Sequence, residues 1–412
     1  MKKSFKILSI IVLVLLTMGL IVGCGGGGGG STDGSTNTTA KWTYMVYLDG
    51  DNNLETAAYY DIFEMQEVGS DQNLNIIVQW DNYGAVDWSG CRRYEIVQDP
   101  TGSQTVVSTM VADMGNVNMG DPNTLVEFAK WGITNYPAEK YCLVLWDHGN
   151  GWKRHEVDGE TVRGICSDDT SNDIITEAEL VQAMSEIVAF RGSAIDVLGM
   201  DACLMGTLEV AYDMRNYSAF QVLSERSEPG TGWPHDTVLG YLKSNPTATA
   251  RDFASIIVDK YRDHYSNESY NYPTLTALDS SKVGAIAQAV DVFSVECINN
   301  MDDTLESALE TARTSAAPAD SAFSSYRDLI GFCNVIAGSN GVTNQIQLYA
   351  AAVQSATSDA IINTWTYTAG YNGLSIWIPD STEFSVYSNT YAALGLAQNT
   401  NYYALLQTIY NN

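Results

Sequence analysis

Short apolar runs that alternate with helix-forming stretches are the feature that most constrains the fold of this chain. Continuous apolar runs of this length are typical of strands that are buried on both faces of a sheet. Their alternation with helices between residues 42 and 224 predicts a mainly parallel sheet with helices packed on it. The predicted strands cover residues 44–48, 74–80, 141–148, 195–200 and 220–223.

The intervening helices have recognisable start and stop signals. Asp121-Pro122 combines an N-cap residue with proline at the first helical position, and Thr176 with Glu179 forms a capping box. The expected helices cover residues 54–68, 121–136, 176–190 and 204–214. Residues 92–97 and 104–107 are expected to form a hairpin, and the polar residues 149–173 a long loop.

Beyond residue 224 the alternation becomes less regular. Helices are expected over residues 237–244, 251–265, 282–300 and 345–357, and strands over 272–278 and 373–379. The 412 residues are enough for one large domain or two ordinary ones. We expect a core over residues 42–265 and a C-terminal part over residues 266–412 that completes or extends the α/β fold, with residues 266–271 as the best candidate boundary.

The N-terminus predicts export. Residues 1–6 are basic and residues 7–22 are apolar, and the segment ends in Leu20-Ile-Val-Gly-Cys24, which resembles a bacterial lipobox. Residues 1–24 are therefore expected to be a lipoprotein signal peptide, with Cys24 as the lipidated residue and residues 25–41 as a flexible tether. The alternative is an ordinary cleaved signal peptide or a short anchor helix. The expected location is the cell envelope, at the outer membrane or cell surface.

The charge balance excludes one class of partner. A formal net charge of −28 repels nucleic acid and anionic membranes, and it favours basic or cationic ligands. The simpler interpretation is that acidity keeps an exported protein soluble.

Two of the predicted strands lead to residues with reactive side chains. His148 ends one strand and Cys203 closely follows another, so that neighbouring parallel strands would bring a thiol to its base. The N–H groups of Gly149 and Cys203 are candidates for an oxyanion hole, and we expect the start of a helix at Cys203 to lower its pKa. Taken singly, His148 could be a hydrogen-bonded strand-end histidine and Cys203 a buried thiol.

The segments around these residues resemble a known family. Asp147-His148-Gly149 and Asp201-Ala202-Cys203 are similar to the signatures of the clostripain-like cysteine peptidases, in the caspase, legumain and gingipain group. Residues 42–54, 224–233 and 373–379 also resemble family segments. The resemblance implies a caspase-like αβα sandwich with a Cys–His dyad, in which Cys203 is the nucleophile and His148 the base.

The resemblance also implies cleavage after Arg or Lys, with acidic residues in the pocket for that side chain. Asp201 matches the family's acidic residue two positions before the nucleophile, although it could instead cap a helix. Glu225, Glu228 and Asp236 are weaker candidates. Some members cleave themselves after the catalytic histidine, and Arg154 and Arg163 are the candidate autolysis sites, with Lys153 beside them; solvated loop charges are the alternative.

No metal or cofactor is predicted. The chain lacks CxxC and HExxH motifs, and the six cysteines other than Cys24 show no disulfide framework. Some relatives depend on calcium, and calcium binding is left open as an alternative. The sequence does not support it, because residues 49–53 resemble an EF-hand loop only superficially: Leu54 and Tyr60 occupy the positions of its Gly and Glu.

The sequence therefore predicts a lipid-anchored extracytoplasmic endopeptidase that acts on polypeptides. The alternatives are a surface lipoprotein that uses the same fold for binding or adhesion with an idle dyad, and an acyltransferase or transpeptidase.

Overall fold

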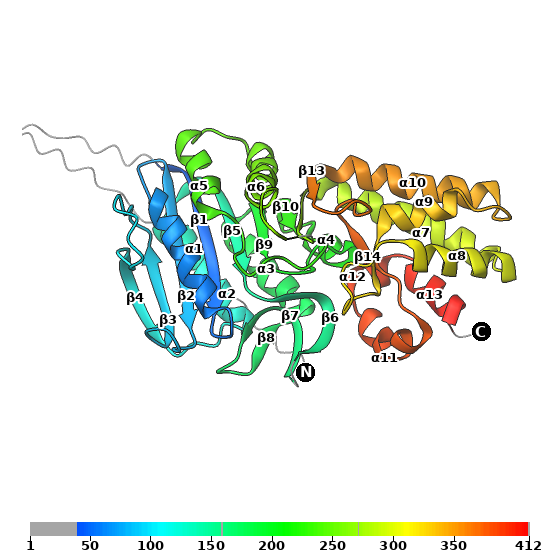
Figure 1. The fold of residues 1–412 in the computed structure, drawn as a ribbon, viewed down its shortest axis with the longest axis horizontal. Helices are drawn as coiled ribbons and strands as arrows, with labels where there is room; N and C mark the ends of the chain where they lie inside the picture. The colour runs from blue at the N-terminus through cyan, green and yellow to red at the C-terminus, as the bar shows by residue number, and fades with distance from the viewer. Residues whose placement is uncertain (1–38, 158–159, 271, 411–412) are drawn as a thin grey trace, which may run out of the picture. The chain divides into compact units, whose positions relative to one another are not determined.

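Within the residues that the computed structural model describes, a nine-stranded sheet forms the centre of the fold (Figure 1). These residues are 39–157, 160–270 and 272–410, and for residues 154–157 and 160–163 the backbone alone is described. Cys24 lies outside the described residues. In spatial order the strands are β13 (Ile361–Thr366), β11 (Thr274–Asp279), β10 (Ser218–Leu223), β9 (Ile195–Asp201), β5 (Ala138–Trp146), β1 (Ala40–Gly50), β2 (Leu74–Asn82), β3 (Gly90–Glu95) and β4 (Thr109–Gly115).

The five central strands, β10, β9, β5, β1 and β2, are parallel, as the apolar runs predict. From β1 the chain passes to β2 on one side, and it later returns to form β5, β9 and β10 on the other side. The strand order therefore reverses between β1 and β5. Ligands of open α/β sheets bind outside the carboxyl ends of the strands at such a switch point, and His148 lies two residues after the end of β5.

Helices cover both faces of this sheet, which makes an αβα sandwich (Figure 1). One face packs against α1 (Glu55–Val68), α5 (His235–Ser244) and α6 (Ala250–Tyr265). The other packs against α2 (Pro122–Asn135), α3 (Glu177–Arg191), α4 (Leu208–Met214) and α7 (Ser280–Asn299). The remaining helices are α8 (Asp303–Ser315), α9 (Leu329–Ala337), α10 (Asn344–Ala360), α11 (Ser381–Tyr391), α12 (Gly395–Asn399) and α13 (Tyr402–Tyr410).

Two small sheets complete the fold of the described residues. The first comprises β6 (Gly149–Val157), β7 (Glu160–Asp168) and β8 (Asp173–Ile175), all antiparallel. The second pairs β12 (Tyr326–Asp328) with β14 (Ser375–Trp377). The expected long loop over residues 149–173 is therefore wrong, because its polar sequence forms ladders whose partners lie in the same segment.

Two element boundaries also differ from the predictions. The second arm of the hairpin is β4, after residue 108, and not residues 104–107. The helix after Cys203 begins at Leu208, where the Thr207 hydroxyl accepts a hydrogen bond from the Val210 N–H, and not at residue 204. The C-terminal part contributes β11 and β13 to the central sheet, so it completes the same α/β layer.

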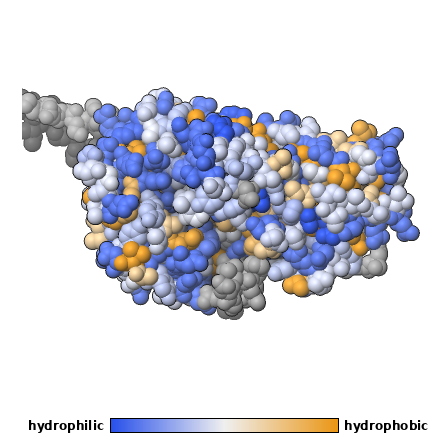
Figure 2. Space-filling view, viewed as in Figure 1, coloured by the Kyte–Doolittle hydropathy of each residue, from blue (hydrophilic) through white to orange (hydrophobic). Residues whose placement is uncertain are grey.

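The visible surface is mainly hydrophilic, with small scattered apolar areas (Figure 2). Within the described ranges, no helix combines the length and the apolar character that crossing a bilayer requires.

Candidate active site

His148 and Cys203 lie at the carboxyl ends of neighbouring strands. β5 and β9 pair in register up to Trp146 and Asp201, so that each reactive side chain follows two residues after this last pair. Both residues line one pocket of about 240 Å³, together with Leu54, Trp146, Asp147, Asp201, Ala202, Glu228, Pro229, Gly230 and Gly232. The parallel register thus brings the predicted thiol and imidazole into one cavity.

The imidazole of His148 is held by Asn53, from the connection between β1 and α1. The Nε2 atom of His148 donates to Oδ1 of Asn53 at 2.6 Å. This hydrogen bond favours the neutral tautomer whose Nδ1 atom carries a free lone pair. Burial lowers the pKa of His148, which further favours the neutral ring. The sequence prediction missed Asn53, because no local pattern links it to a residue 95 positions away.

The Cys203 thiol lies against the backbone of Glu228. The N–H of Glu228 donates to Sγ at 3.1 Å, and the thiol lies 3.8 Å from the Glu228 carbonyl oxygen. Burial raises the pKa of Cys203 to about 11, although the Glu228 N–H acts in the opposite direction. The expected low pKa is therefore wrong, because Cys203 stands in a turn and not at a helix N-terminus.

That turn has a constrained backbone. Leu204 has φ +64°, a left-handed conformation that is uncommon for a residue with a side chain. Its N–H donates to the carbonyl of Arg226 at 3.0 Å. Gly149 packs against the same turn, and a Cβ atom there would lie 2.4 Å from the Cys203 carbonyl oxygen. Glycine at position 149 is therefore a condition for the close approach of the two strand ends.

Acidic side chains also line this pocket. Asp201 is buried, and its Oδ2 atom accepts from the Trp233 N–H at 3.0 Å and lies 3.4 Å from Nε2 of His235. Burial and the nearby Asp201 raise the pKa of Glu228 well above its ordinary value. Asp61, on α1, does not line the pocket, but one of its carboxylate oxygens is within 4.8 Å of Asp201 and of His235. Asp61 and His235 were not predicted.

Glu225 does not line this pocket. It is fully buried, and its Oε2 atom accepts from the N–H of Gly373 at 2.9 Å. Asp236 is likewise not among the pocket residues; it lies in the first turn of α5. The structure therefore brings Asp201 and Glu228 to the cavity but not the other two candidate acids.

The candidate autolysis sites fall on the two antiparallel strands β6 and β7. Arg154 pairs with Arg163 in the ladder, and the side chains of both lie outside the described part of the structure. The neighbouring Lys153 is buried, and its ammonium forms an ion pair with Glu383. Because Lys153 is buried, it is not an accessible cleavage site.

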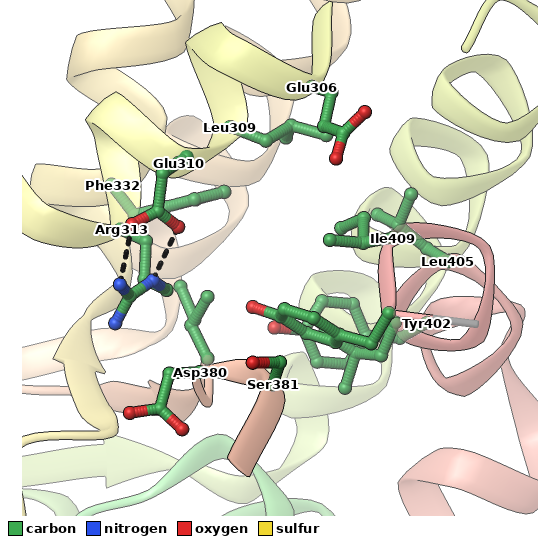
Figure 3. A pocket seen from close by; sticks show the side chains of 13 residues that line it. Glu306, Leu309, Glu310, Arg313, Phe332, Asp380, Ser381, Tyr402, Leu405 and Ile409 are labelled. Atoms are coloured by element: carbon green, nitrogen blue, oxygen red, sulfur yellow. Dashed lines mark hydrogen bonds and ion pairs between the residues drawn. The ribbon is translucent and has the colours of Figure 1, made fainter. Parts of the chain in front are cut away.

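A second and larger pocket of about 430 Å³ has a different location (Figure 3). Figure 3 shows Leu309 of α8 facing Leu405 and Ile409 of α13, with the Glu310–Arg313 ion pair at one side. It shares no lining residue with the cavity at Cys203.

The described cysteines are all free thiols, and Cys203 is the only one of these six that is not buried.

Comparisons with known proteins agree with this arrangement. The model of the Clostripain family matches residues 46–407. Clostripain of Hathewaya histolytica is 28% identical over 405 residues, which cover 84% of this chain and 76% of that protein. A secreted C11 cysteine protease from Bacteroides thetaiotaomicron, solved with an irreversible peptide inhibitor, has a TM-score of 0.65 at 22% identity, over 89% of this chain and 99% of that one. An inactive zymogen C11 protease from Parabacteroides distasonis has a TM-score of 0.68 at 19% identity, over 88% and 99%.

A caspase-like sandwich with a thiol and an imidazole at the ends of adjacent strands defines the class of caspase-like cysteine peptidases. Since the family match covers most of its length, the chain belongs to the clostripain family, and it is a clostripain-like cysteine peptidase.

Proposed function

We propose that this peptidase hydrolyses peptide bonds after Arg or Lys, with Cys203 as nucleophile and His148 as general base. The observation that carries the proposal is the single cavity in which both side chains meet buried carboxylates. The proposed hydrolysis requires no cofactor. The substrates are polypeptides with a basic residue at the cleavage position.

The reaction begins from a neutral thiol and a neutral imidazole, in line with the raised pKa of Cys203 and the lowered pKa of His148. Nδ1 of His148 takes the thiol proton as Sγ attacks the carbonyl carbon, and the N–H groups of Gly149 and Cys203 are the candidate donors to the oxyanion. The imidazolium then gives its proton to the leaving amine. Water, deprotonated by the same ring, releases the acyl group from the thioester.

The basic preference rests on Asp201 and Glu228. Both are buried at the cavity, where the cationic end of Arg or Lys would relieve the cost of placing two carboxyl groups side by side. We expect Asp201→Asn to lower kcat/KM for Lys substrates by about 100-fold, an amount typical of removing one partner of a buried charge pair. The activity on a substrate with norleucine in place of Lys is the control and should change little.

The test of the catalytic pair is labelling with Arg- and Lys-directed chloromethyl ketones. Wild-type protein should be alkylated at Cys203, as mapped by peptide mass spectrometry, while Cys203→Ala and His148→Ala should not react. His264→Ala is the matched control, since this histidine is exposed on α6. Labelling at another cysteine, or the absence of both labelling and peptide cleavage, would overturn the assignment in favour of a binding protein. Added amine acceptors that capture the acyl group would indicate transpeptidation.

Maturation and location form a second part of the proposal. Cleavage after Arg154 or Arg163 in the β6–β7 ladder would mature the enzyme, and the existence of an inactive zymogen in the Parabacteroides distasonis relative supports such a step.

The lipobox-like segment supports a lipid anchor at Cys24 outside the cytoplasm, and the Bacteroides thetaiotaomicron relative is described as secreted. Metabolic labelling with a palmitate analogue should mark wild-type protein but not Cys24→Ala.

A further inference from the structure

A groove of about 750 Å³ lies between α1 and the β3–β4 edge of the central sheet. Much of its lining is aromatic or apolar. Tyr59, Tyr60 and Phe63 come from α1, whereas Trp88 comes from the β2–β3 loop and Met110 from β4. The groove shares no lining residue with the cavity at Cys203 or with the pocket of Figure 3.

Three of the lining side chains are large, apolar and about half exposed. Tyr60 is 51% exposed, Val86 53% and Met110 50%. Soluble proteins seldom gather such side chains at one place on their surface unless the place binds a partner. Aromatic residues and methionine are also the types that are enriched in protein interfaces. The lining therefore indicates a binding site for apolar side chains.

The groove is preformed, because two buried polar side chains of α1 hold the loops beside it. The Glu55 carboxylate accepts from the N–H groups of residues 84, 85 and 86 at 3.0, 2.9 and 3.3 Å. Gln66 accepts from the N–H groups of residues 107 and 108 at 2.8 and 3.0 Å, and it donates to the Thr105 carbonyl at 2.9 Å. A ligand would therefore bind without first having to order these loops.

The groove begins beside the catalytic cavity. Leu54, the residue before α1, lines the cavity, and Thr56, two residues later, lines the groove. In the sheet, β9 leads to Cys203 and the neighbouring β5 leads to His148; β1, β2 and β3 then follow in the same direction, toward the groove. From Thr56 to Phe63 the helix rises by about 10 Å, a length that about three residues of an extended peptide would cover.

We propose that this groove binds the part of a polypeptide substrate that follows the cleaved bond, and that it selects apolar or aromatic side chains there. The inference rests on the proposed function. In that mechanism His148 protonates the leaving amine, so the departing part of the substrate must lie on the imidazole side of the thiol. This is the side of the sheet on which the groove lies, whereas Asp201 and Glu228 receive the basic side chain before the bond.

The kinetic test compares two internally quenched peptides that are identical up to the Lys at the cleavage position. One continues with Phe, Leu and Tyr, and the other with Gly and Ser. We expect wild-type protein to prefer the apolar peptide by at least about 10-fold in kcat/KM, an amount typical of burying one large apolar side chain. Tyr60→Ala should reduce this preference by at least about 5-fold, mainly through KM. The ratio of the two peptides cancels any effect on the catalytic pair itself.

Tyr367→Ala is the matched control, since this tyrosine is 43% exposed and lies outside the groove. It should keep the wild-type preference. Circular dichroism checks that the variants fold, and Met110→Ser, from β4, replaces Tyr60→Ala if that variant does not.

Binding is measured separately in the Cys203→Ala background, which excludes catalysis. A fluorescein-labelled peptide that consists of the apolar part alone should bind and raise the fluorescence anisotropy. The Gly and Ser peptide should not. Adding Tyr60→Ala should weaken binding by at least about 5-fold, whereas adding Tyr367→Ala should leave it unchanged.

The proposal is wrong if wild-type protein cleaves the two peptides equally well, or if Tyr60→Ala keeps the full preference. It is also wrong if wild-type protein is a dimer in size-exclusion chromatography that Tyr60→Ala converts to a monomer, because a second copy then covers the groove. Chloromethyl ketone labelling of Cys203 without binding of the apolar peptide would contradict the groove alone. Binding of that peptide without any labelling would contradict the proposed function.

Discussion

In the proposed mechanism, the hydrogen bond to the amide oxygen of Asn53 leaves Nδ1 of the His148 ring free to act as the base. Because the hydrogen bond strengthens when the ring becomes an imidazolium, its loss should affect the chemical step more than substrate binding. We expect Asn53→Ala to lower kcat by about 10- to 100-fold, which corresponds to about 1.5–3 kcal/mol for a hydrogen bond to a charged group. KM should stay within about twofold. Steady-state kinetics measure both, with Asn135→Ala on α2 as the control; an unchanged kcat would contradict the orienting role.

The protonation states of His148 and Cys203 in the proposed mechanism predict the pH dependence of thiol reactivity. His148 must be neutral to accept the Cys203 proton, and burial lowers its pKa below the ordinary value of 6.5. Reactivity should therefore be lost only as the pH falls through this lowered pKa. Inactivation by iodoacetamide, a neutral reagent that does not use the acidic pocket, isolates the effect. The rate should reach a plateau by about pH 7 and rise again toward the Cys203 pKa of about 11. A half-maximal rate above pH 7 on the acid side would contradict a lowered His148 pKa.

At the scale of the elements, the β6–β7 ladder would hold the two fragments of the chain together after autolysis. β7 remains paired with β8, and β6 is anchored by Trp152, whose ring lies 5.0 Å from that of Trp377. We expect wild-type protein to give two fragments on a denaturing gel that still co-elute in native chromatography. Cys203→Ala should stay intact, and Arg154→Ala with Arg163→Ala should block cleavage. A single band from wild-type protein after prolonged incubation would exclude autolysis.

The strands that lead to His148 and Cys203 could be predicted from sequence because burial on both faces leaves a continuous apolar run, as in β5 and β9. The turn after Cys203 could not. The apolar spacing of Leu204 and Leu208 fits a helix, but Gly206 approaches the backbone of Glu225 so closely that a Cβ atom would lie 2.6 Å from its nitrogen. The buried Asp51–Asp81–Asp168 group was also beyond prediction, since its members come from three distant segments and have no common spacing.

At the scale of the whole molecule, the acidic composition has a different role inside the protein than on its surface. Surface carboxylates explain much of the net charge of −28, but several acids are fully buried and hold segments together. Glu209 at the start of α4 is the clearest case. Its Oε1 atom accepts from the Trp377 N–H at 3.0 Å and from the Tyr391 hydroxyl at 3.0 Å, which connects the C-terminal segments to α4.

Burial raises the pKa of Glu209 from 4.5 to about 7. Because the folded state binds this proton more tightly than the unfolded state, Glu209 stabilises the fold fully below pH 4.5, and this contribution is lost as the pH rises to 7. It amounts to on the order of 3 kcal/mol for this buried group. We therefore expect Tm to fall between pH 5 and pH 8, and Glu209→Gln, which is uncharged throughout, to reduce that fall. Glu268→Gln, at an exposed position, should follow the wild-type curve. Parallel curves for wild-type and Glu209→Gln protein in calorimetry would show that Glu209 is ionised in the folded state across this range.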